Sequence, residues 1–259
     1  MMNSDHSELI SVILPVYNCE QSIEAAVSSV LEQTFQNIEL IIVDDASDDK
    51  TADICRKLSA NDKRIKLITN SNNCGALESR IKAARQAKGE WLSLIDADDM
   101  WRPDKLEKQL VFRDAKKCDI VYTGSAFIDM DGSSFDWVMH VPEEVSFKKL
   151  LKQNIISNSS VMVRREDYIR YSPSEWHGKD LHEDYACWLS MLKDGRTACG
   201  IDEPLFIYRV SKGSRSGNKF KAATMNMTTY KYVGLGFFAS HINEICYVFN
   251  GLIKYSHFR

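Results

Sequence analysis

The chain has 259 residues and a formal net charge of −3 at pH 7, with 44% hydrophobic and 27% charged residues. These values are ordinary for a globular protein with a full core and agree with a soluble enzyme. The seven cysteines include no Cys-x-x-Cys pair, which argues for reduced thiols in the cytoplasm and against a disulfide framework or a zinc site. Residues 1–8 lack the apolar core of a secretion signal.

The predicted elements begin with an apolar strand over residues 9–18, where Asn18 and Gln21 fit a helix N-cap and its N3 partner. An amphipathic helix follows. The next elements are strand 39–43, helix 51–58, strand 65–69, helix 76–88 stopped by Gly89, and strand 92–95. This alternation predicts an α/β fold with a doubly wound, mostly parallel sheet.

Acidic residues follow two of these strands. Asp44 and Asp45 come directly after strand 39–43, and Asp96, Asp98 and Asp99 come directly after strand 92–95. The carboxyl ends of parallel strands meet at one edge, where open α/β sheets bind ligands. Crowded carboxylates repel one another unless a cation neutralises them. Mg²⁺ and Mn²⁺ prefer oxygen ligands and are commonly shared between protein carboxylates and a substrate diphosphate. The alternative is a solvated acidic loop that opens the helix after Arg102-Pro103-Asp104.

Six ordered motifs between residues 9 and 216 resemble those of family-2 glycosyltransferases of the GT-A fold, the inverting type that builds bacterial surface glycans. Three come from the first half: the segment 11–18 with 29–34, the Val43-Asp44-Asp45 segment, and Arg80 followed by residues 87–90 and the Asp96-Ala97-Asp98-Asp99 segment. Three come from the second half: residues 158–165, Glu183-Asp184 with residues 185–189, and residues 203–209 with Gly213, Ser214 and Ser216.

The resemblance implies a role for each candidate residue. Asp99 would bind the Mn²⁺ or Mg²⁺ ion, Asp98 the same ion or the ribose, and Asp96 would support them. Asp45 would accept a hydrogen bond from the base, Tyr17 would stack on it, and Arg80 would steer the base or the diphosphate. The backbone of Pro15 and Val16 would contact the base. Asp184 would be the general base that takes the acceptor proton, with Glu183 as the alternative.

Each role has a structural alternative. Tyr17 could cover the sheet edge, Asp45 could cap the following helix, and Asp184 could serve only the helix dipole. Ala186 stands where the family often has a third acidic residue. His177 and His182 lie near the expected acceptor loop, as plain loop residues or as acceptor contacts.

The C-terminal segment is strongly basic. From residue 205 onward eight basic residues stand against Glu244 alone, a charge of +7 that leaves −10 for the rest of the chain. Apolar residues recur at helical spacing over residues 232–253, but His241, Asn243, Glu244 and Asn250 argue against a membrane span. The pattern suggests a basic amphipathic helix on an anionic membrane surface, a partner helix, or a helix packed on its own domain.

These observations predict a GT-A domain over residues 1–216, with a nucleotide-sugar half (1–110) and an acceptor half (111–216), and a helical tail over 217–259. The expected function is transfer of a sugar from a UDP-sugar to a glycan or a polyprenyl-diphosphate-linked acceptor, in synthesis of O-antigen, capsule or lipooligosaccharide. We expect a cytoplasmic protein, peripheral on the inner face of the membrane, with no nucleic-acid partner and with the tail as a candidate oligomer contact. The alternatives are an inactive nucleotide-sugar binding module and a receiver-type phosphoacceptor domain.

Overall fold

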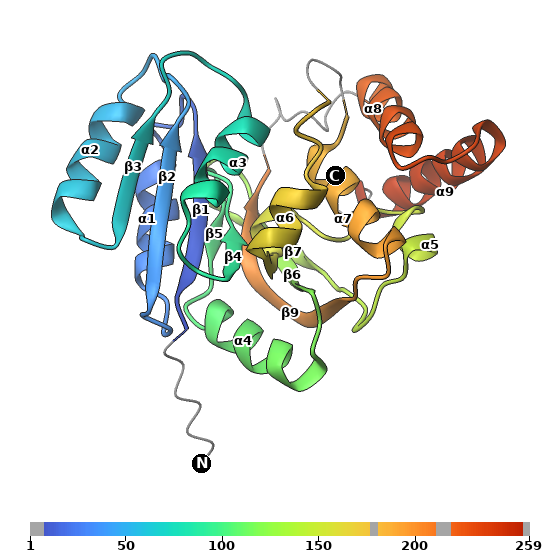
Figure 1. Ribbon diagram of the computed structural model, residues 1–259, viewed down its shortest axis with the longest axis horizontal. Helices are drawn as coiled ribbons and strands as arrows, with labels where there is room; N and C mark the ends of the chain where they lie inside the picture. Colours follow the sequence, from blue (N-terminus) through green and yellow to red (C-terminus); the bar gives the residue numbers. More distant parts are fainter. Residues whose placement is uncertain (1–7, 177–180, 211–218, 256–259) are drawn as a thin grey trace.

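The computed structural model describes residues 8–176, 181–210 and 219–255. Within these ranges nine strands form a single sheet with the order β3-β2-β1-β4-β8-β6-β9-β5, and β7 pairs with β6 (Figure 1). Helices cover both faces of this sheet. The predicted α/β fold is therefore confirmed, with a mixed sheet: four of the strand pairings in these ranges are parallel and four are antiparallel.

The first half of the sheet is wholly parallel. Its strands are β1 (Ile10–Val16), β2 (Ile38–Asp44), β3 (Ile65–Thr69) and β4 (Trp91–Leu94). The connecting helices are α1 (Ile23–Leu31), α2 (Thr51–Asn61) and α3 (Ala76–Gln86). Every residue of β1 and β4 is buried, as expected for strands covered by helices on both faces.

The second half mixes strand directions. The antiparallel strand β8 (Met162–Arg164) joins β4 to β6 (Ile120–Ile128), and β9 (Ala198–Arg209) runs parallel to β6. The remaining strands are β7 (Ser134–Met139) and the short β5 (Met100–Trp101), which pairs with the end of β9. The helices are α4 (Lys105–Lys116), α5 (Phe147–Leu150), α6 (Arg165–Tyr171), α7 (Glu183–Lys193) and a 3₁₀ turn, η1 (Asn158–Ser160).

The sheet separates two hydrophobic cores. Ile13 and Ile41 point into a core with α3, α6 and α7, whereas Leu14 and Ile42 point into a core with α1, α2 and α4. Successive residues of a strand alternate between its faces, so an unbroken apolar run serves both cores. This placement leaves only the two ends of the strands for polar chemistry.

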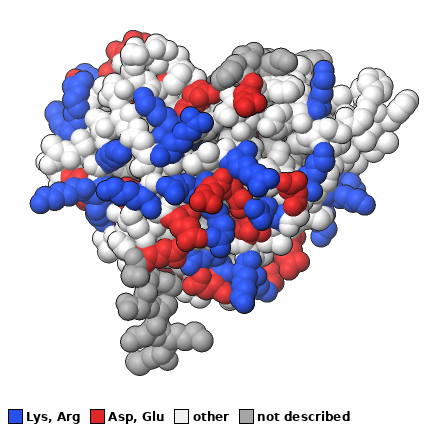
Figure 2. Space-filling model, viewed as in Figure 1, with Lys and Arg blue, Asp and Glu red and all other residues white. Residues whose placement is uncertain are grey.

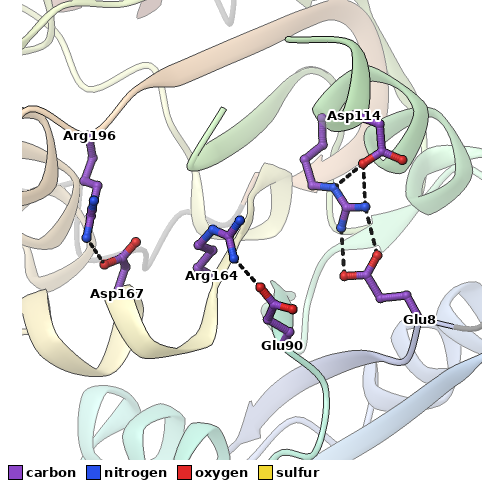
Figure 3. Close-up of polar contacts among 7 residues, drawn as sticks. Glu8, Glu90, Asp114, Arg164, Asp167 and Arg196 are labelled. Carbon is purple, nitrogen blue, oxygen red and sulfur yellow. Dashed lines mark hydrogen bonds and ion pairs between the residues drawn. The ribbon is translucent and has the colours of Figure 1, made fainter. Parts of the chain in front are cut away.

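Ion pairs hold the amino-terminal edge of the sheet. Glu8 precedes β1, Glu90 precedes β4 and Arg196 precedes β9, and each has a partner of opposite charge (Figure 3). The pairs are Glu8–Arg113 at 2.8 Å, Glu90–Arg164, and Asp167–Arg196 at 2.9 Å. The carboxyl-terminal edge, in contrast, carries the crowded aspartates after β4.

The C-terminal tail forms two helices, α8 (Lys219–Tyr232) and α9 (Phe237–Tyr255), with Gly234 at φ 77° between them. Tyr230 and Val233 lie in the same core as α7, and the Tyr230 hydroxyl donates to the carbonyl of Leu151 at 2.9 Å. No described helix is long and apolar enough to cross a membrane. The domain boundary at residue 216 falls outside the described residues and stays a prediction; the burial of Tyr230 favours a boundary after α8.

Two expectations are wrong. Cys118 and Cys199 form a disulfide, contrary to the expectation of reduced thiols. Cys118 lies just before β6 and Cys199 lies in β9, and these two strands run side by side. The other cysteines of the described chain are free thiols. Asn18 is not the N-cap of α1, which is Ser22; it has φ 48°, and its side chain accepts from the amide of Asp48 instead. His177, Gly213, Ser214 and Ser216 lie outside the described residues.

Candidate active site

The predicted donor residues gather at the carboxyl-terminal edge of the parallel strands. Tyr17 follows β1, Asp45 follows β2, and the segment 96–99 follows β4. Pro15 and Val16 are buried inside β1, where the carbonyl of Val16 accepts from the amide of Asp45. Tyr17 is 46% exposed.

Asp45 is a buried carboxylate that holds the turn before α3. It accepts hydrogen bonds from the amides of Cys74 (3.0 Å) and Gly75 (2.7 Å) and from the side chain of Asn70 (2.7 Å). Burial acts to raise the pKa of Asp45, but the hydrogen bonds from Cys74 and Asn70 outweigh it, so this pKa lies below its usual value. Asp45 does not cap α2, whose first amide is bound by Asp49.

Asp99, the last residue of the acidic segment, is only 2% exposed. Its carboxylate accepts from the hydroxyl of Ser159 and from the amide of Arg209 at 3.2 Å. Burial, with the nearby charges of Asp98 and Asp96, raises the pKa of Asp99 well above its usual value. Desolvation by the surrounding protein and the charge of Asp96 also raise the pKa of Asp98, although this residue is exposed at the surface. Both shifts mean that a cation next to these carboxylates would stabilise their ionised forms.

A divalent cation fits this donor set when a substrate completes its coordination. The described residues contain no cluster of three or more His, Cys, Asp or Glu side chains arranged around a metal. Mg²⁺ sites, however, commonly use one or two carboxylates together with phosphate oxygens and water. Asp98 and Asp99 supply the two carboxylates, so the site matches an ion that arrives with a diphosphate.

Arg80 connects three parts of the site. It lies on α3 with 5% exposure, its Nη2 is 2.5 Å from Oδ1 of Asp96, and its Nη1 is 3.6 Å from Oε1 of Glu183. Burial acts to lower the pKa of Arg80, but the carboxylate of Asp96 and the other anionic groups outweigh it, and the guanidinium stays charged. The ion pairs bring the first turn of α7 to the segment after β4.

The two acidic residues at the start of α7 have different surroundings. Glu183 faces Arg80, whereas Asp184 lies 3.4 Å from the side-chain amide of Asn154. Burial and the neighbouring Glu183 raise the pKa of Asp184. A carboxylate with a raised pKa is a stronger base, which is the property that a general base needs.

Sequence reasoning missed Ser159 and Arg209 as site residues. Ser159 belongs to η1, and its hydroxyl also accepts from the amide of Asp96 at 3.0 Å. Arg209 ends β9, and its Nε donates to the carbonyl of Asp98 at 3.2 Å. Ser159 and Arg209 belong to the motifs at residues 158–165 and 203–209. However, only the pairing of β8 and β9 with the rest of the sheet shows that they contact the acidic segment.

The fold and its acidic edge define the GT-A class. Crystal structures of Staphylococcus aureus TarS residues 1–349 have the same fold; the complex with UDP superposes with a TM-score of 0.65 at 21% identity and covers 92% of this chain and 70% of that one. The mannosyltransferase PcManGT of Pyrobaculum calidifontis, solved with GDP-Man and Mn²⁺, superposes with a TM-score of 0.64 at 20% identity and covers 88% and 65% of the two chains.

The family model for glycosyl transferase family 2 matches residues 11–172, and the chain belongs to this family. It is 39% identical to the putative teichuronic acid biosynthesis glycosyltransferase TuaG of Bacillus subtilis, over 87% of this chain and 88% of that one. It is 36% identical to the Escherichia coli UDP-Glc:alpha-D-GlcNAc-diphosphoundecaprenol beta-1,3-glucosyltransferase WfaP, over 96% of each chain. The protein is thus a glycosyltransferase, and the resemblance seen in its motifs is confirmed.

Proposed function

We propose that this enzyme is an inverting, metal-dependent glycosyltransferase that moves a sugar from a UDP-sugar to a lipid-linked diphosphate or glycan acceptor in bacterial surface polysaccharide synthesis. The main support is that Asp99 and Asp184 lie on two segments that are linked by one residue. Arg80 pairs with Asp96 in the first segment and with Glu183 in the second. One carboxylate is suited to the metal and the other to the acceptor proton. The names of TuaG and WfaP, and the TarS complex with UDP-GlcNAc, support the donor and acceptor classes.

Asp98 and Asp99 would hold the Mn²⁺ or Mg²⁺ ion. The ion supplies neutralisation of the charge that grows on the leaving diphosphate. Asp99 is fixed for this task by Ser159 and the amide of Arg209, so its carboxylate needs little rearrangement when the donor binds. The Mn²⁺ in the PcManGT structure supports a divalent ion in this fold.

The nucleoside would bind between Tyr17 and Asp45. Oδ1 of Asp45 accepts from Asn70 and Cys74, whereas Oδ2 accepts from Gly75 and keeps its second lone pair for a ring N–H. Tyr17 offers its exposed ring for stacking. The backbone of Pro15 and Val16 would line the base.

Asp184 would take the proton of the acceptor hydroxyl as that hydroxyl attacks the anomeric carbon from the side opposite the diphosphate. Such direct displacement inverts the anomeric configuration and needs one general base. Glu183 would instead hold Arg80 in place. A lipid-linked acceptor would bring the reaction to the inner face of the cytoplasmic membrane.

Donor turnover tests the proposal. We expect release of UDP from one or more UDP-sugars with Mn²⁺ and an acceptor, and loss of release with EDTA. Asp99→Asn should abolish the gain in UDP affinity that Mn²⁺ confers, whereas the exposed Asp53→Asn should keep it. Equal UDP affinity in EDTA and Mn²⁺ would remove the metal role. UDP binding without turnover across donors and lipid-diphosphate acceptors would favour the inactive binding module; membership of family 2 already argues against the receiver-type alternative.

A further inference from the structure

The outer face of α9 carries a continuous row of exposed apolar side chains. Phe238 is 81% exposed and Ile245 is 71% exposed, far above the level of ordinary packed apolar residues. Phe237, Ile242, Val248 and Phe249 are also exposed. Spacings of three and four residues place most of these side chains on one side of the helix. An apolar patch of this kind marks a surface that meets a partner.

The opposite face of α9 is fixed to the protein. Glu244 accepts from Asn226 of α8, and the Tyr247 ring lies 5.9 Å from that of Tyr185 in α7. The side chain of Asn250 donates to the carbonyl of Lys152 at 3.1 Å. These contacts determine the rotation of α9 about its axis, so the apolar row is held outward by packing.

Positive charge lies near the protein-facing side of α9. The contact between Asn250 and Lys152 places α9 next to the segment 148–152, where Lys148, Lys149 and Lys152 are exposed. Glu244, the acidic residue of α9, faces the protein, which leaves the outer face of α9 without a carboxylate. Figure 2 shows the outer part of the tail as a largely uncharged projection with lysine and arginine side chains nearby.

We propose that the outer face of α9 inserts into the surface of an anionic lipid bilayer, with Lys148, Lys149 and Lys152 contacting the lipid headgroups. An amphipathic helix that lies in the membrane plane combines an apolar face with nearby cations in this way. A second copy of the chain fits less well, because a two-fold contact through α9 would gather the α5 lysines of both copies with no carboxylate on the outer face to pair with them. The inference rests on the proposed function only for its purpose, the meeting of enzyme and lipid-linked acceptor.

Vesicle binding tests the inference on the full chain. We expect binding to vesicles of phosphatidylglycerol and phosphatidylcholine, weaker binding to phosphatidylcholine alone, and a decrease with added salt because the Debye length is about 10 Å at 0.1 M. Phe238→Glu with Ile245→Glu should weaken binding about 10-fold or more, since charge in place of buried apolar side chains removes the insertion. Val111→Glu is the matched control: Val111 is 57% exposed on α4, and its substitution should leave binding unchanged.

A triple substitution of Lys148, Lys149 and Lys152 by Gln should remove the preference for anionic lipid. Binding that is absent, that ignores salt, or that survives Phe238→Glu with Ile245→Glu would overturn the inference. A dimer in sedimentation that the same double variant converts to a monomer, without vesicle binding, would assign the face to a second copy. Release of UDP from donor in solution is measured alongside: its absence with normal vesicle binding contradicts the proposed function alone, and its persistence without vesicle binding contradicts this inference alone.

Discussion

The hydroxyl of Ser159 donates a hydrogen bond to the buried carboxylate of Asp99. Ser159 is itself held from below, because its carbonyl accepts from the indole of Trp101 at 2.8 Å and the carbonyl of Ser160 accepts from Gln109 at 2.9 Å. The buried Lys105, in turn, donates to Gln109. The orientation of the proposed metal ligand therefore depends on Trp101 of β5 and on Lys105 and Gln109 of α4.

Ser159→Ala should weaken the binding of Mn²⁺ with UDP. A hydrogen bond to a charged group contributes about 1.5–3 kcal/mol, so the Mn²⁺-dependent gain in UDP affinity should fall about 10-fold or more. Titration calorimetry with Mn²⁺ and with EDTA measures this gain. Ser160→Ala is the control, because the Ser160 hydroxyl donates to the carbonyl of Ser157 and not to Asp99. Equal losses in both variants would mean that Ser159 only supports the fold.

Asp184→Asn should lower the rate of transfer by about 10² or more and change UDP affinity by no more than about a few fold. Glu183→Gln should act mainly on donor affinity, because it loosens Arg80. The raised pKa of Asp184 predicts that the rate falls as pH decreases through a value above the usual carboxyl range, since protonation removes the base. pH–rate profiles of the unchanged enzyme and of each variant measure this fall in rate. If Glu183→Gln alone lost transfer while keeping its UDP affinity, Glu183 rather than Asp184 would be the residue that takes the proton.

Arg80→Met should destabilise the protein by about 2 kcal/mol or more. The substitution leaves Asp96 and Glu183 without their shared cation, and removing one partner of a largely buried pair costs more than the pair contributes. Urea denaturation measures the change in the free energy of unfolding. Arg56→Met is the matched control, since the Arg56–Asp53 pair is exposed and is expected to contribute less than about 1 kcal/mol. A similar loss in both variants would contradict the bridging role of Arg80.

Tyr230→Ala should destabilise the protein by about 3–5 kcal/mol, because a fully buried aromatic ring leaves a cavity and the carbonyl of Leu151 loses its donor. Phe238→Ala, on the exposed face of α9, should change stability by less than about 0.5 kcal/mol.

Because Tyr230 of α8 lies in the core, we expect a chain that ends at residue 216 to lose its cooperative thermal transition. A chain ending at residue 235, which keeps α8, should retain it. Normal melting of the shorter chain would support the boundary at 216.

The sequence by itself determined the parallel half of the sheet and the composition of its ligand edge. Strands β1 and β4 are apolar at every position but Ser11 and Ser93, so they are expected to lie under helices on both faces. Parallel direction then places the residues that follow each strand at one edge. Tyr17, Asp45 and Asp99 could be grouped on these local grounds, and the ordered motifs added Arg80 and Asp184.

Only the tertiary structure decided which side chains contact one another at this edge of the sheet. Ser159 contacts Asp99, and Arg80 lies between Asp96 and Glu183, because β8 and α7 return to the sheet from distant parts of the chain. The same long-range pairing of β6 with β9 joins Cys118 to Cys199. Hydrophobic periodicity reports the faces of one element and carries no information on its neighbours. For that reason the amphipathic tail was visible in the sequence, whereas the burial of Tyr230 and the outward face of α9 required the packed molecule.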